Sequence, residues 1–264
     1  MNVTCDLHIH TNLSICAKPE ATVEAYLDLC QENGITTIGL ANHCWAGPMP
    51  RSCGWADWYS KQSMESILAL RNQKSIHDIR ILIGCESEYL GAGVVGMTKE
   101  AASQFDYVLI PASHFHQWGF TVPGDFAGSQ PQTVRDLLRR RFIEVAGLEI
   151  ATGIAHPFIP FGFFEIEEEI ISGITDKAYE ECFRVAAAAN ISVEIHHHAV
   201  FSQIRPNDNG FSSEYVRMLT IAKACGCIFH FGSDAHHPSN FKGHERMGQF
   251  AEACGITEDD LLKI

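Results

Sequence analysis

Residues 6–16 read DLHIHTNLSIC, and residues 232–238, near the other end of the chain, read GSDAHHP. Each segment follows a short apolar run and carries two potential metal ligands that are two positions apart. The pairs are His8 with His10, and Asp234 with His236. Because side chains two residues apart on a strand point to the same face, each pair can grip one ion from the end of a strand.

Five more apolar stretches between these segments also end in a histidine or a carboxylate. They are GLANH with His43, IGCESEY with Glu86, LIPASHFH with His114 and His116, GIAHP with His156, and VEIHHH with His196 to His198. A parallel barrel delivers the ends of all its strands to one face. One such histidine alone is as readily an ordinary hydrogen-bonded residue. The whole set at matching strand ends predicts a metal site.

Strand and helix patterns alternate along the chain. The predicted strands are short and almost continuously apolar, as in buried parallel sheets; they cover residues 3–8, 35–41, 79–86, 106–112, 148–155, 191–196 and 227–232. The predicted helices cover residues 22–34, 60–74, 98–104, 131–146, 176–190, 212–224 and 243–255. The least regular segment, residues 44–59, is expected over the barrel mouth. An open sheet would place its ligand at one switch point, whereas here every strand end carries a candidate ligand. We therefore predict an α/β fold with one closed seven-stranded (β/α)7 TIM-like barrel domain, residues 1–264.

Length and charge limit the class of protein. The 264 residues fit one large barrel or two small domains, and 46% of them are apolar. A net charge of −13 argues against long duplex nucleic acid or an anionic membrane as partner. It does not exclude a phosphorylated substrate, because bound cations reverse the charge locally. No signal-peptide or membrane-spanning pattern is visible, so we expect a cytoplasmic protein with its 10 cysteines mostly reduced. The oligomeric state stays open.

The motifs DLHIHTNLS, ANH, GCE, ASH, AHP and GSDAH resemble, in this order, those of the polymerase-and-histidinol-phosphatase (PHP) family. The resemblance covers essentially the whole chain. It implies a distorted seven-stranded barrel that holds three metals, often zinc, manganese or iron, and hydrolyses phosphoesters. By position, the first metal would lie among His8, His10, Glu86 and Asp234. Glu86 would bridge to a second metal held by His114 and His156, and His43 and His236 would bind a third.

Three positions depart from or duplicate the family pattern. Cys16 stands where relatives place an Asp or His ligand of the third metal. A thiolate suits zinc or iron but not magnesium; the alternative is an ordinary small buried residue. Asn42 replaces the usual Asp before His43, which predicts a weak or empty third site. In the fourth motif we prefer His114, which follows Ala112-Ser113 directly, although His116 points the same way.

Candidate substrate contacts lie near the sixth strand end, where many relatives carry Glu-Ile-Asn. His196 stands in place of that Asn. It either lines the mouth as a polar residue, or contacts substrate and donates a proton to the leaving group. In relatives resembling histidinol phosphatases, an Arg after this strand contacts phosphate, so Arg205 is the preferred anion clamp. Lys18 and Arg51 are weaker candidates, because basic residues in loops are usually solvated.

These residues predict a metal-dependent phosphoesterase acting on a small phosphorylated metabolite, either histidinol-phosphate-like or a nucleotide. A hydroxide bridging the first two metals would attack phosphorus, with Glu86, Asp234, His236 and His196 as the catalytic set. One alternative is an exonuclease or phosphodiesterase acting on nucleic-acid ends. The other is an amidohydrolase, which commonly uses a carboxylated lysine as the metal bridge. The eight lysines avoid the strand ends, and Glu86 occupies the bridging place.

Overall fold

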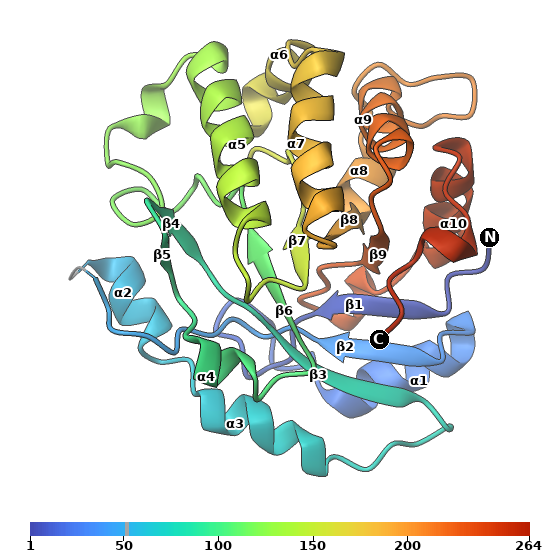
Figure 1. Ribbon diagram of the computed structural model, residues 1–264. Helices are drawn as coiled ribbons and strands as arrows, with labels where there is room; N and C mark the ends of the chain where they lie inside the picture. Colours follow the sequence, from blue (N-terminus) through green and yellow to red (C-terminus); the bar gives the residue numbers. More distant parts are fainter. Residues whose placement is uncertain (51–52) are drawn as a thin grey trace.

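The computed structural model describes residues 1–50 and 53–264 (Figure 1). Its centre is a seven-stranded sheet in which every neighbouring pair of strands is parallel. In spatial order the strands are β1 (Cys5–Ile9), β2 (Thr37–Leu40), β3 (Arg80–Glu86), β6 (Tyr107–Pro111), β7 (Gly153–Ala155), β8 (Ser192–His196) and β9 (Phe229–Gly232). Ile9 bridges to Ala235 just beyond β9, so the first and last strands meet. The predicted seven-stranded barrel is confirmed, and it is nearly closed.

Helices pack outside the strands. They are α1 (Val23–Asn33), α2 (Gly54–Tyr59), α3 (Met64–Ala69), α4 (Lys99–Ala102), α5 (Pro131–Ala146), α6 (Glu167–Ser172), α7 (Asp176–Ala188), α8 (His197–Phe201), α9 (Ser213–Ala224) and α10 (His244–Ala253). Figure 1 shows α5, α7 and α9 side by side over one part of the barrel. Several helices begin after a Ser or Thr whose hydroxyl accepts a backbone N–H of the first turn, as at Thr22 and Thr175.

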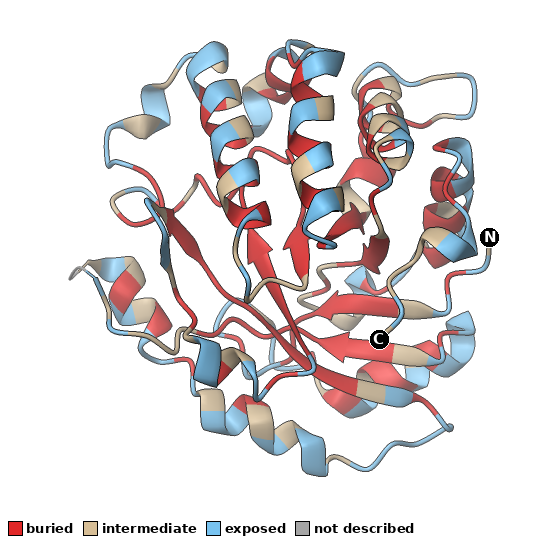
Figure 2. Cartoon of the chain, in the orientation of Figure 1, coloured by how far each residue is buried: buried red, intermediate tan, exposed pale blue. Residues whose placement is uncertain are grey.

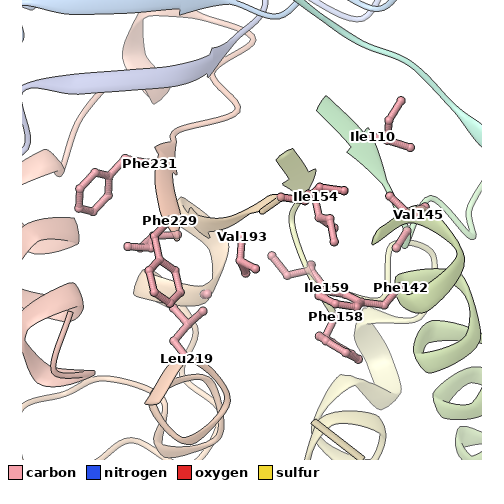
Figure 3. Packing of buried hydrophobic residues seen from close by; sticks show 14 of the residues in the cluster. Ile110, Phe142, Val145, Ile154, Phe158, Ile159, Val193, Leu219, Phe229 and Phe231 are labelled. Atoms are coloured by element: carbon pink, nitrogen blue, oxygen red, sulfur yellow. The ribbon is translucent and has the colours of Figure 1, made fainter. Parts of the chain in front are cut away.

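The core follows from the apolar runs of the sequence. In Figure 2 the strands are buried, whereas the outer faces of the helices are exposed. Figure 3 shows part of the layer between strands and helices, where Phe142 of α5 stacks on Phe158 with ring centroids 5.0 Å apart. Inside the barrel, the ring of Tyr107 fills the space left by Gly39 and Gly84, since a Cβ on either glycine would collide with it. Side chains therefore fill the barrel interior below the carboxyl ends of the strands.

Several elements differ from the prediction, among them the short helices α6 and α8, which were not predicted. The irregular segment 44–59 contains α2, and the helix predicted for residues 60–74 is shorter, because Ser63 caps a new helix, α3, which ends in a 3-10 turn at Leu70–Asn72. A small hairpin, β4 (Tyr89–Gly91) with β5 (Val94–Val95), was not predicted; positive φ angles at Gly91 and Gly93 form its turn.

The strand predicted for residues 148–155 begins only at Gly153. The N–H of Leu148 and that of Ala151 both donate to carbonyls three residues earlier, so this segment is a pair of turns and does not extend the sheet. Among the helices that the structure describes, none is both long and apolar enough to cross a bilayer.

Candidate metal centre

The carboxyl ends of the strands bring three groups of potential metal ligands together. In each group the ligand atoms lie within 4.8 Å of one another. The groups are His8, His10 and Glu86; Glu86, His114 and His156; and His10, Cys16, His43 and His236. Asp234 adjoins the first group, with its Oδ1 3.2 Å from His10 Nε2 and 3.5 Å from His8 Nε2. All nine residues predicted as ligands thus converge, as expected for the mouth of a parallel barrel.

Glu86, the last residue of β3, lies at the centre of these groups. Its Oε2 is 3.5 Å from His8 Nε2 and 3.4 Å from His10 Nε2. Its Oε1 is 3.0 Å from His156 Nε2 and 3.6 Å from His114 Nε2. Burial alone would raise the pKa of this carboxyl, but the surrounding imidazoles hold it well below its usual range. Glu86 is therefore an ionised carboxylate with one oxygen directed to each of two ligand groups.

Hydrogen bonds at Nδ1 orient the imidazoles. The partners are Glu194 for His8 at 2.7 Å, Ser14 for His10 at 3.3 Å, Glu88 for His114 at 2.7 Å, and Ser113 for His156 at 2.8 Å. The carboxylates of Glu194 and Glu88 accept a hydrogen bond from Nδ1–H of His8 and His114, so that Nε2 of each ring would be left to donate its lone pair to a bound ion. Histidine ligands of metals in proteins are held in this way.

The sequence analysis did not assign Glu194, Glu88 or Ser113 to the site. Glu194 also accepts a short hydrogen bond from the backbone N–H of His156, so it contacts two of the ligand groups. Their spacing could have indicated a role, because Glu194 precedes His196 by two residues and Glu88 follows Glu86 by two. Side chains two residues apart on a strand point to the same face. Only the folded barrel shows which imidazole each carboxylate meets.

Asn42 organises the loop that carries Cys16. Its Oδ1 accepts hydrogen bonds from the Thr11 N–H at 2.8 Å and from the Ser14 hydroxyl at 2.9 Å. Ser14 in turn contacts His10 Nδ1 and accepts the N–H of His43. The amide oxygen therefore supplies an acceptor at this position, where the sequence suggested that one was lost. The occupancy of the third site remains a prediction.

Of the two histidines in the fourth motif, His114 belongs to a ligand group. His116 lies beside it, with ring centroids 5.1 Å apart, and lines the adjoining cavity. Burial and the neighbouring His114 and His156 lower the pKa of His116 to about 3, so its imidazole is neutral.

Two members of the cluster, His156 and Asp234, have positive φ angles of 32° and 53°. Such backbone strain is typical of functional sites.

Two cavities open onto the cluster and share Phe161 and Asp234. One, of about 230 Å³, adds Cys16, His43, Glu86, His114 and His236 to a wall of aromatic side chains. The other, of about 410 Å³, is lined by His196, His197, His198, Phe201, Ser202, Ser233 and Asn240. His196 Nε2 is 3.4 Å from Asp234 Oδ2 but makes no hydrogen bond with a described residue. A larger hollow of about 600 Å³, beside residues 127–131 and 162–166, contains none of the predicted site residues.

Of the predicted anion-binding residues that the structure describes, neither Arg205 nor Lys18 lines either cavity. Arg205 has positive φ, and its guanidinium donates to Glu168 at 2.8 Å and to Glu214 at 3.2 Å. Lys18 is exposed, and its backbone N–H donates to the carbonyl of His236. Arg51 lies outside the described residues. Neither cavity has a Lys or Arg among its described lining residues, so the proposed clamps remain predictions.

The profile of the PHP domain family matches residues 6–198. The chain belongs to the PHP family. As a PHP protein it is a metal-dependent phosphoester hydrolase, the enzyme class that the motifs predicted. A comparison with curated protein sequences gave no match.

Two solved structures share the fold of this PHP protein. Histidinol phosphate phosphatase from Lactococcus lactis is 15% identical with a TM-score of 0.61, over 96% of this chain and 94% of the other. A proposed histidinol phosphatase from Listeria monocytogenes is 14% identical with a TM-score of 0.65, over 91% and 98%. At these identities the likeness confirms the fold alone.

Proposed function

We propose that the protein hydrolyses a small phosphorylated metabolite with the help of two or three divalent transition-metal ions. The observation that carries this proposal is the position of Glu86, whose two carboxylate oxygens are directed to separate groups of imidazoles. A carboxylate shared in this way is suited to bridge two cations.

The donor set fits such ions. Imidazole mixed with carboxylate suits zinc, manganese or iron, and a cation would offset the negative charge that Glu86 and Asp234 bring into the barrel mouth. His43 supports the same conclusion, because its buried Nδ1 lies 3.2 Å from Glu86 Oε2 yet has no hydrogen-bond partner among the described residues. A bound ion would satisfy this nitrogen. We assign His8, His10, Glu86 and Asp234 to the first ion, Glu86, His114 and His156 to the second, and Cys16, His43 and His236 to the third.

Bound divalent ions would supply Lewis acidity and lower the pKa of a water molecule toward neutrality. The side chains of the protein would orient the ligand imidazoles and supply a proton to the leaving group. Glu194 and Glu88 fix His8 and His114 through Nδ1. His196, whose Nε2 lacks a hydrogen bond and faces Asp234, is our candidate to give a proton to the leaving alkoxide.

The choice of a small substrate rests on two observations. The two cavities that open onto the ligand groups have volumes of about 230 and 410 Å³, at or below the lower part of the usual range of about 300–1,000 Å³ for small-molecule sites. In addition, the Lactococcus protein of the same fold was solved with zinc, L-histidinol and phosphate. A histidinol-phosphate-like ester or a nucleotide is therefore the first class to test.

The test is a panel of phosphate monoesters and diesters assayed with protein reconstituted with Mn, Zn or Fe. We expect phosphate release from at least one small monoester. Glu86→Gln, purified in the same way, controls for contaminating phosphatases and should be inactive. Hydrolysis of nucleic-acid ends without hydrolysis of any small monoester would instead favour the exonuclease alternative. Cleavage of amides without phosphoesters would contradict the proposal.

A further inference from the structure

We propose that α2 supplies a recognition surface for a flat aromatic ring on the alcohol side of the substrate. This inference rests on the proposed phosphoesterase function. The surface consists of the side chains of Trp55 and Trp58 on α2, together with His116, Gln117 and Phe161, all of which line the cavity of about 230 Å³. The ligand groups form the other side of that cavity, so a phosphoester held by them can place its alcohol against these rings.

The rings form a continuous arc around the cavity. Trp58 meets His43 edge to face at 5.1 Å, and Trp55 meets Trp58 at 6.0 Å. His116 lies 5.5 Å from Trp55 and 5.8 Å from Phe161. Phe161 closes the arc, because its ring packs at 4.7 Å against that of His156. The arc therefore runs from the third ligand group to the second.

The helix that bears the two tryptophans has its own attachment to the metal centre. Ala56 and Tyr59 are buried in a small apolar cluster with Leu90 and Phe120, apart from the main barrel core. The hydroxyl of Tyr59 donates to Glu88, the carboxylate that orients His114. Figure 1 shows α2 beside β4 and β5, away from the helices that cover the rest of the barrel. The position of α2 is thus fixed relative to the candidate ligands.

The tryptophans themselves are only partly buried. Two large aromatic side chains that remain partly exposed next to a polar cluster gain free energy when a second apolar surface covers them. A flat ring covers them best, because offset stacking and edge-to-face contacts between aromatic rings stabilise beyond area burial alone.

Polar atoms on the same wall also lack partners. The Nδ1 of His116 and the Oε1 of Gln117 are buried, yet neither has a hydrogen bond to any residue that the structure describes. Gln117 uses its Nε2 to donate to Glu88 and Tyr59, so its Oε1 is fixed as an acceptor. Unpaired buried polar atoms are costly, and a ligand whose ring edge carries a donor would satisfy them. The preferred substrate is thus a phosphoester whose alcohol carries a flat ring with a polar edge.

The test compares two non-hydrolysable probes of similar size, benzylphosphonate and cyclohexylmethylphosphonate, by calorimetric titration of the metal-loaded chain. Inorganic phosphate serves as the reference ligand. We expect benzylphosphonate to bind about two- to tenfold more tightly than its saturated counterpart, the range typical of one aromatic contact. Trp55→Leu and Trp58→Leu should each bring this ratio toward one while metal content is retained. Trp118→Leu, at an exposed position outside the cavity, should keep the wild-type ratio.

The outcomes separate this inference from the function on which it rests. If phosphate and both phosphonates bind but the wild-type ratio is one, or if both tryptophan variants keep the preference, ring recognition by α2 is rejected and the phosphoesterase proposal stands. If the metal-loaded protein binds neither phosphate nor either phosphonate, the proposed function itself is rejected.

Discussion

The Nδ1 of His8 lies 2.7 Å from Oε1 of Glu194, and both side chains are buried in the barrel mouth. The contact joins β1 to β8, strands that lie far apart in the sequence but on either side of β9 in the barrel. Burial opposes the charge on Glu194, but His8 and His196 lower the pKa of its carboxyl to about 2. Glu194 is thus an ionised acceptor that directs the Nε2 of His8 toward Glu86.

Glu194→Gln should weaken metal binding or activity by about ten- to a hundredfold, because an amide cannot hold the His8 tautomer as a carboxylate does. The measurement is metal affinity by competition with a chromophoric chelator, together with kcat/KM. Glu65→Gln, at an exposed position with no ion pair among the described residues, is the matched control. Wild-type affinity and turnover in Glu194→Gln would show that the contact does not orient a ligand.

Glu86→Gln should reduce activity by at least about a hundredfold and lower metal content at two sites at once, because an amide cannot supply charge to two cations. Circular dichroism should show the barrel still folded. The measurement is elemental analysis of protein dialysed against a metal buffer. A variant that keeps wild-type turnover and metal content would contradict the assignment of Glu86 as the shared ligand.

Removal of metal should destabilise the fold. The barrel mouth holds the carboxylates of Glu86 and Asp234 close to several imidazoles, and a bound cation contributes stability only to the folded chain. At metal concentrations about 1,000 times Kd, the gain is about 4 kcal/mol, or a rise in Tm on the order of 10 °C. The change in Tm is measured by thermal unfolding of the protein with chelator and again after metal is added back. An identical Tm in both states would argue that no ion binds the native protein.

Cys16 should act as a thiolate ligand of the third ion. Cys16 is exposed, but desolvation of its thiol at the barrel mouth and the nearby carboxylates of Glu86 and Asp234 raise its pKa. Without a metal the thiol is therefore protonated, and a bound ion would displace that proton. Cobalt-substituted protein should therefore show a thiolate-to-cobalt charge-transfer absorption in the near ultraviolet. Cys16→Ser should lose this absorption, and Cys16→His should retain the third ion without it. Cys254, a buried cysteine outside the ligand groups, offers the control Cys254→Ala, in which the absorption should persist.

Arg205→Ala distinguishes the role predicted from sequence from the contacts seen in the structure. A phosphate clamp predicts a fall of roughly ten- to a hundredfold in kcat/KM. With the guanidinium paired to Glu168 and Glu214 outside both cavities, we expect kcat/KM to stay within about twofold. Steady-state kinetics on a confirmed phosphoester, with Arg205→Lys in parallel, decide between them. A tenfold loss of kcat/KM in both variants, with metal content unchanged, would support Arg205 as the phosphate-binding residue.

The sequence also left the neighbourhood of α2 undetermined. Residues 44–59 have no clear period, because Trp, Gly and Pro interrupt any apolar repeat. The helix forms through tertiary contacts: Ala56 and Tyr59 pack on Leu90 and Phe120, and the hydroxyl of Tyr59 finds Glu88. Tertiary packing of this kind routinely decides the structure of short helices, since a single turn has little stability of its own.

The sequence by itself determined the barrel of this protein and predicted the candidate ligands that the fold brings together. Short apolar strands alternating with helices allow few topologies, and a parallel barrel places every strand end at one mouth, so His8 and Asp234 meet although they are more than 200 residues apart. Only the tertiary structure decided which carboxylate orients which imidazole, and that Arg205 turns toward Glu168 instead of the cavity. The physical reason is that strand position depends on local periodicity, whereas side-chain pairing depends on distances of a few ångströms between elements that the sequence separates.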